Sequence, residues 1–241
     1  MRQNSICRML AIVFVLGAIA IAQDGNWVQL FDGRTLEGWT RQGGNATYEV
    51  KDGMIIGTAV RGSGNTFLCK GSFSDFILEL DVLCDRELNS GVQIRSYAYE
   101  KDTLEPYLEE VPELTRIRKK GEVVGYQCEI ADAASGLSGH FWDEGRENKW
   151  LDGPFQKPEA SKAYKNAEWN HFRIVAQGNR IRSWINGISC ADFRDDTDAS
   201  GLICLQVSHI MEGPGPYQVR FRNIRIRELE PSEKADSSSK E

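Results

Sequence analysis

One stretch near the middle of the chain gathers acidic, amide and aromatic side chains between two expected strands. It runs from Gly125 to Arg146 and reads GYQCEIADAASGLSGHFWDEGR. Because side chains alternate faces along a β-strand, Cys128 and its apolar neighbours are expected to point into a core, whereas Gln127 and Glu129 share the opposite face. Such a face suits general acid–base chemistry or sugar recognition. The alternative interpretation is a solvated strand and hairpin.

A second group of polar and aromatic side chains follows a turn of small residues. Trp142, Asp143, Glu144 and Arg146 bring two more carboxylates and a guanidinium close to Glu129. Two neighbouring carboxyl groups can act as a base and an acid in the same reaction. The segment is therefore a candidate site.

The strand expected over Asn89–Ser96, reading NSGVQIRS, places further polar groups near that site. If its Val and Ile side chains face the core, Gln93 and Arg95 lie on the opposite face, where Arg95 is expected to pair with Glu129. An arginine fork binds carboxylates or sugar oxygens at two points. The alternative for Arg95 is an ordinary charge at the rim of the sheet.

Two more candidates come from the strand expected over Gly201–Ser208. Alternation along it adds Gln206 to the polar face, and His209 follows directly after the strand. A lone histidine is also commonly a packed or rim residue.

A third pair of acids, Glu79 and Asp81, resembles part of the E-x-D-x-E pattern of laminarinase-type glycosidases. Leu83 occupies the third position, so this strand lacks a full carboxylate set. We expect Glu79 and Asp81 to lie on a solvated face.

Composition indicates a globular protein, and the pattern of the first 22 residues indicates export. The chain has 241 residues, 41% hydrophobic and 27% charged, with a formal net charge of −6. Arg2 and Arg8 precede the apolar run Met9–Ala22, which is too short to span a bilayer and ends in a small-residue cleavage site, so residues 1–22 are predicted to be a signal peptide. The acidic balance argues against nucleic acid as a partner.

Cysteine and histidine usage favours neither a disulfide framework nor a zinc site. Cleavage leaves an odd number of cysteines, and Cys128 is expected to be a small buried residue of the core, so we expect mostly free thiols. No Cys-x-x-Cys or clustered Cys/His spacing occurs, and the only histidines are His140, His171 and His209.

Short β-branched and aromatic runs with a turn signal every eight to twelve residues predict an all-β sandwich over residues 23–229. Asp52-Gly53 and Asn186-Gly187 are expected hairpin turns. Apolar parity switches within Val219–Ile226, as a bulge requires. The segment Tyr97–Glu122 is predicted to be a rim loop with a turn or two of helix, and residues 230–241 a disordered tail.

Eight blocks in order, LFDGRTLEGW, NSGVQIRS, GYQCEIAD, WDEGR, EWNHFRI, GNRIRSWINGISCADF, GLICLQV and VRFRNIRIREL, resemble the 3-keto-disaccharide hydrolase family, once called domain of unknown function 1080. The resemblance covers about Trp27 to Leu229. It implies a concanavalin A-like, laminin-G-like jelly roll of two antiparallel sheets and glycan metabolism outside the cytoplasm, secreted or periplasmic. Related sequences often read LQVH where this chain places a serine before His209.

The resemblance implies chemistry on a 3-keto-glycoside substrate. A ketone at carbon 3 acidifies the hydrogen on carbon 2, so the group on carbon 1 can leave by elimination, and hydration completes net hydrolysis. We expect Glu129 to act as base, Arg95 to hold the enolate oxygen and Glu144 to act as acid, with a divalent cation as the alternative to Arg95. Expected substrate-binding residues are Gln93, Gln127, Trp142, Asp143, Arg146, Gln206 and His209.

Two other functions fit the same residues. A non-catalytic carbohydrate-binding module of this fold needs aromatic platforms and amides but tolerates loss of Glu129, and a surface interaction domain needs no sugar at all. The sequence leaves open the glycoside, the linkage, any metal and the oligomeric state.

Overall fold

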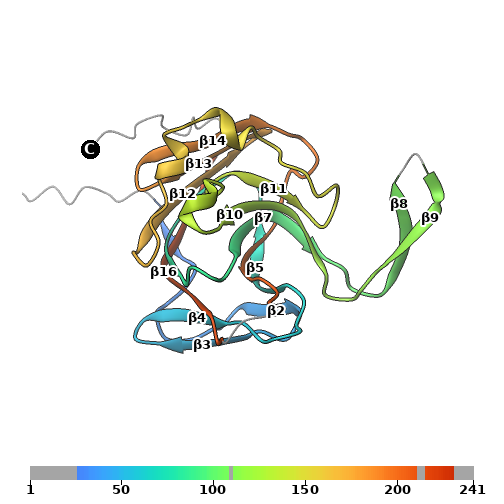
Figure 1. The fold of residues 1–241 in the computed structure, drawn as a ribbon, viewed down its shortest axis with the longest axis horizontal. Coiled ribbons are helices and arrows are strands. Elements are labelled where there is room, and N and C mark those ends of the chain that lie inside the picture. Colours follow the sequence, from blue (N-terminus) through green and yellow to red (C-terminus); the bar gives the residue numbers. More distant parts are fainter. Residues whose placement is uncertain (1–25, 109–110, 211–214, 231–241) are drawn as a thin grey trace, which may run out of the picture.

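The computed structural model of the protein describes residues 26–108, 111–210 and 215–230. The expected signal peptide (1–22) and nearly all of the expected tail (230–241) lie outside these residues. The regular secondary structure of the described chain is almost all β-strand, arranged in two main sheets and one separate hairpin (Figure 1).

The larger sheet has eight strands, all paired antiparallel. They are β1 (Val28–Gln29), β3 (Thr47–Lys51), β4 (Met54–Thr58), β6 (Phe76–Cys84), β12 (Asn170–Gln177), β13 (Arg180–Ile185), β14 (Ile188–Arg194) and β16 (Gln218–Glu228). Seven follow the order β14-β13-β12-β6-β16-β4-β3, and β1 pairs with β16.

The smaller sheet has six antiparallel strands. They are β2 (Trp39–Gly43), β5 (Thr66–Phe73), β7 (Ser90–Ala98), β10 (Val123–Ile130), β11 (Phe141–Glu144) and β15 (Gly201–Val207), in the order β11-β10-β7-β15-β5-β2. The connections include three 3₁₀ turns, η1 (Ala133–Ser135), η2 (Pro154–Gln156) and η3 (Ala160–Lys162).

The two sheets pack their apolar faces together. Tyr126, Cys128 and Ile130 of β10 join Leu78 and Leu80 of β6 in one continuous buried core. This arrangement confirms the predicted two-sheet jelly-roll sandwich, because alternation along each strand supplies one apolar face per sheet.

Local turn chemistry also follows the sequence. Asp52-Gly53 and Asn186-Gly187 have positive φ at both positions, as a two-residue hairpin loop with a type I′ turn requires. The register of β16 shifts between Arg222 and Arg225, where Asn223 has φ 53°. The expected bulge in the last strand is therefore confirmed.

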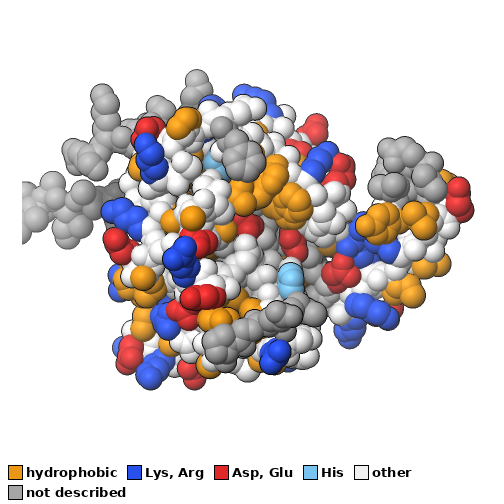
Figure 2. Space-filling model, in the orientation of Figure 1, with side chains coloured by type: hydrophobic (Ala, Val, Ile, Leu, Met, Phe, Trp, Pro, Cys, Tyr) orange, Lys and Arg blue, Asp and Glu red, His pale blue; other side chains and the backbone are white. Residues whose placement is uncertain are grey.

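The segment Tyr97–Glu122 differs from its prediction as a rim loop with some helix. It continues the β7–β10 pair into a hairpin of β8 (Thr103–Leu108) and β9 (Val111–Arg118), which stands away from the rest of the molecule (Figure 1). Hydrophobic side chains lie exposed along it (Figure 2). The prediction was wrong because the two prolines suggested a break in strand structure, whereas an edge strand tolerates them.

The prediction that Glu79 and Asp81 lie on a solvated face was also wrong. Glu79 is only 6% exposed, because its direct cross-strand neighbours Arg173 and Arg225 cover it and donate hydrogen bonds to its carboxylate. Asp81 accepts hydrogen bonds from His171 at 2.9 Å and Asn223 at 2.7 Å. These acids form a charge network on the outer face of the larger sheet.

The thiols are mostly free, as expected. Cys84, Cys128 and Cys190 are buried and unpaired, whereas Cys69 and Cys204 form a disulfide between directly paired positions of β5 and β15. Within the described residues, no helix is long and apolar enough to cross a membrane.

Candidate functional site

The outer face of the smaller sheet, turned away from the core, carries the candidate site; we call it the site face. Gln127 on β10 lies directly opposite Gln93 on β7 and Trp142 on β11. Gln206 on β15 lies opposite Gly91, the next position along this face of β7. Directly opposed residues in antiparallel strands point to the same face, so alternation brings these predicted side chains together.

Glu129 lies at one side of this face and is 8% exposed. Its carboxylate accepts hydrogen bonds from the amides of Asn89 and Gln127, the latter at 3.0 Å. Burial raises the pKa of Glu129 to about 7, and the nearby Glu144 adds to this, while the two amides act in the opposite direction. Glu129 can therefore accept or release a proton near neutral pH.

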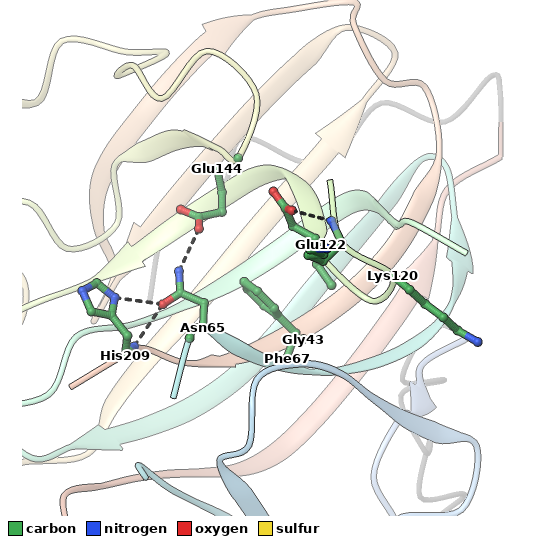
Figure 3. A pocket seen from close by; sticks show the side chains of 11 residues that line it. Gly43, Asn65, Phe67, Lys120, Glu122, Glu144 and His209 are labelled. Atoms are coloured by element: carbon green, nitrogen blue, oxygen red, sulfur yellow. Dashed lines mark hydrogen bonds between the residues drawn. The ribbon is translucent and has the colours of Figure 1, made fainter. Parts of the chain in front are cut away.

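Glu144 lies on the same face and is linked to His209 through Asn65 (Figure 3). Asn65 donates to the Glu144 carboxylate at 2.9 Å, and its oxygen accepts from the backbone NH of His209 at 3.0 Å and stands 3.2 Å from the His209 ring nitrogen Nδ1. Burial also raises the pKa of Glu144. These residues border a pocket of about 400 Å³ between the sheet and the base of the β8–β9 hairpin.

Gly91 has no side chain, and this leaves room for the side-chain amides of Gln93, Gln127 and Gln206, which we call the amide layer, to pack flat against the sheet. A Cβ at this position would stand 2.6 Å from Cγ and Cδ of Gln127, so only glycine lets that amide lie across β7 and reach Glu129. The buried Oε1 atoms of Gln93 and Gln206 receive no hydrogen bond from the described residues. Two oxygen atoms of the amide layer are thus left without a hydrogen-bond donor from the described residues.

Arg95 does not join this face, contrary to the prediction that it pairs with Glu129. Arg95 and Ser96 together oppose the single residue Gly125, and Arg95 has φ 46°, so a β-bulge interrupts the alternation. Its side chain is 1% exposed and donates to the Ser74 carbonyl at 2.8 Å and to the Asp75 carboxylate at 2.8 Å. Arg95 therefore ties loops together at the end of the sandwich.

Asp143 and Arg146 also lie apart from Glu129. Asp143 alternates with Trp142 and Glu144, which places it on the core side, where it accepts a hydrogen bond from Arg146 at 2.6 Å. The Arg146 guanidinium lies 4.8 Å from the centre of the Tyr126 ring. The structure thus separates this pair from the other predicted substrate-binding residues.

Three polar or aromatic residues of the site were missed. Asn65 and Asn89 precede strands, where alternation makes no statement about side-chain direction, although Asn89 begins the NSGVQIRS block. Trp150 lies in a loop and forms an isolated antiparallel bridge with Trp142. Within the described ranges, no group of three or more His, Cys, Asp or Glu side chains could hold a metal ion.

The site face combines a buried carboxyl group that titrates near neutrality with a second carboxyl group of raised pKa, several amides and a histidine. A family model described as the 3-keto-alpha-glucoside-1,2-lyase-like domain matches residues 26–227. The chain belongs to this family. The match covers both sheets and the whole site face.

Solved structures of the same fold agree with this architecture. Carbohydrate binding module CBM66 from Bacillus subtilis is 18% identical with a TM-score of 0.52, and the match covers 78% of this chain and 94% of that one. A proposed glycosyl hydrolase from Parabacteroides distasonis is also 18% identical with a TM-score of 0.52, covering 85% and 94%. At this identity the likeness shows the fold alone. A comparison with curated proteins finds no match.

Proposed function

We propose that this lyase-like protein cleaves glycosides whose sugar carries a ketone at carbon 3, and that the site face performs the reaction. The observation that carries the proposal is the placement of two carboxyl groups of raised pKa, the buried Glu129 and the half-buried Glu144, on one polar sheet face beside His209. The family description names a 1,2-lyase, which fits elimination between carbons 1 and 2.

In the proposed reaction, Glu129 removes the hydrogen on carbon 2, and the electron pair of that bond passes to the enolate of the ketone. The bond from carbon 1 to the leaving oxygen then breaks, a double bond forms between carbons 1 and 2, and Glu144 protonates the leaving oxygen. Addition of water across the double bond completes net hydrolysis. A pKa of about 7 leaves enough Glu129 ionised at neutral pH to act as base.

The enolate oxygen requires a hydrogen-bond donor, and Arg95 is bound elsewhere. The donors on the site face are the side-chain amides, such as Gln206, and His209 at the edge of the pocket. The expected export of the chain fits a carbohydrate substrate outside the cytoplasm.

The test uses the mature protein in D₂O with a panel of 3-keto-disaccharides, followed by mass spectrometry. Elimination predicts either an unsaturated sugar lighter than the hydrolysis product by one water, or a keto sugar with deuterium at carbon 2. The same disaccharides with a hydroxyl at carbon 3 serve as controls and should remain intact. Equal cleavage of both sets, or of neither, would contradict the proposal.

A carbohydrate-binding module is the second candidate, favoured by the layer of Gln93, Gln127 and Gln206. Glutamine amides are groups that recognise sugar hydroxyls without chemistry. This role predicts saturable binding of the same disaccharides with no turnover, and binding that survives Glu129→Gln.

A further inference from the structure

Trp142 and Trp150 form an aromatic corner at the edge of the site face. Trp142 belongs to β11, the edge strand, and Trp150 lies opposite it in an isolated antiparallel bridge. The ring centres are 5.1 Å apart and the ring planes cross at 68°. Both side chains are partly exposed. A ligand can therefore stack on the face of one indole ring while the other indole ring contacts its side.

Strand register places this corner beside the two carboxyl groups. Gln93, Gln127, Trp142 and Trp150 form one row across neighbouring strands on one face. Glu129 lies two residues beyond Gln127 on β10, and Glu144, which is opposite Gly125, lies on the other side of the row. A sugar held between the two carboxyl groups therefore lies over Gln127, and the next side chains across the sheet are the two tryptophans.

The spacing fits two linked sugars. Neighbouring strands lie about 4.8 Å apart, so the corner begins one strand away from Gln127 and ends two strands away. The backbone holds it in place, because the NH of Leu151 donates to the Phe141 carbonyl at 2.9 Å and the NH of Asp143 to the Lys149 carbonyl at 2.9 Å. The segment carrying Trp150 therefore runs as a short extra strand beside β11, and the corner needs little ordering on binding.

We propose that the Trp142–Trp150 corner is a second subsite that binds the leaving-group unit of a disaccharide by stacking its apolar ring face on an indole. The proposal rests on the proposed function for the identity of the neighbouring sugar. Stacking rewards a flat apolar face and gives nothing to a small alkyl group. The protein should therefore prefer disaccharides to methyl glycosides of the same keto sugar.

The test compares kcat/KM for a 3-keto-disaccharide with kcat/KM for methyl 3-keto-glucoside. Trp150→Ala should lower the ratio of the two values roughly tenfold, and Trp150→Phe should restore most of it. Trp184→Phe is the matched control, because Trp184 lies on β13 of the other sheet and its loss should leave the ratio unchanged. An equal loss with both substrates, or no loss, would overturn the proposal.

A second measurement separates the subsite from the chemistry. The Glu129→Gln protein and the Glu129→Gln, Trp150→Ala double variant are each titrated with the disaccharide, which neither cleaves, and binding is measured by calorimetry. The Kd of the double variant should be roughly tenfold higher. If no 3-keto-glycoside is turned over by the wild type, the proposed function fails, yet this titration still decides the subsite. An unchanged Kd would remove Trp150 from sugar binding.

Discussion

At the scale of single residues, the hydrogen-bond partners of Glu129 set it apart from the other buried acids. Glu79 and Asp143 accept hydrogen bonds from arginines, whose positive charge favours the ionised carboxylate. Both hydrogen-bond partners of Glu129 are neutral amides, Asn89 and Gln127. These hydrogen bonds therefore offset only part of the free-energy cost of burying the negative charge, and the pKa of Glu129 rises to about 7. A carboxyl group in this condition is suited to proton transfer at neutral pH.

The raised pKa of Glu129 predicts a specific dependence of stability on pH. The folded protein holds the Glu129 proton more tightly than the unfolded chain, where the pKa is about 4.5. This contribution, on the order of 3 kcal/mol, is complete below pH 4.5 and is lost as pH rises through 7. Glu129→Gln cannot ionise, so its melting temperature should exceed that of the wild type by several degrees at pH 8.5 and match it near pH 4.5. Thermal unfolding at both pH values measures this, and a constant difference would refute the assignment.

At the scale of elements, strict alternation predicted the site wherever a strand stays regular. It placed Gln93, Gln127 and Glu129 on one face, as the structure has them. It failed at Arg95, because a bulge inserts one residue into β7 and reverses the direction of that side chain. The bulge in β7 falls at the polar residues Arg95 and Ser96, where no switch of apolar parity marks it as one does in β16.

The close approach between β7 and Gln127 gives a prediction for one small substitution. In Gly91→Ala the new methyl group displaces the Gln127 side chain, so Glu129 loses the hydrogen bond of 3.0 Å that lowers its pKa. The midpoint of the kcat/KM profile against pH should move upward, and turnover at pH 7 should fall and partly recover at higher pH.

Gln127→Ala is the matched comparison for this substitution, because it removes the same hydrogen bond without crowding the sheet. Both variants should shift the pH midpoint in the same direction. A lower melting temperature with an unmoved midpoint in both variants would mean that Gln127 only packs against Gly91.

At the scale of the whole molecule, the fold class could be predicted and the strand order could not. The number of short strands and their one-sided apolar pattern indicate a sandwich. The neighbours across the sheet depend on long-range pairing, which local patterns do not encode. The Cys69–Cys204 disulfide joins segments far apart in sequence and follows from the pairing of β5 with β15. The Asn65–Glu144 hydrogen bond also joins distant segments, but β5, which Asn65 precedes, and β11 are not neighbours in the sheet.

We propose that the site face cleaves 3-keto-glycosides with Glu129 as the base. The most direct measurement is kcat for Glu129→Gln beside the wild type on the same 3-keto-disaccharide, together with both melting temperatures. Glutamine keeps the size and part of the hydrogen bonding but accepts no proton, so we expect kcat to fall by roughly 10²–10⁴ with no loss of melting temperature. Unchanged kcat in a folded Glu129→Gln protein would contradict the account and leave Glu144 as the candidate base.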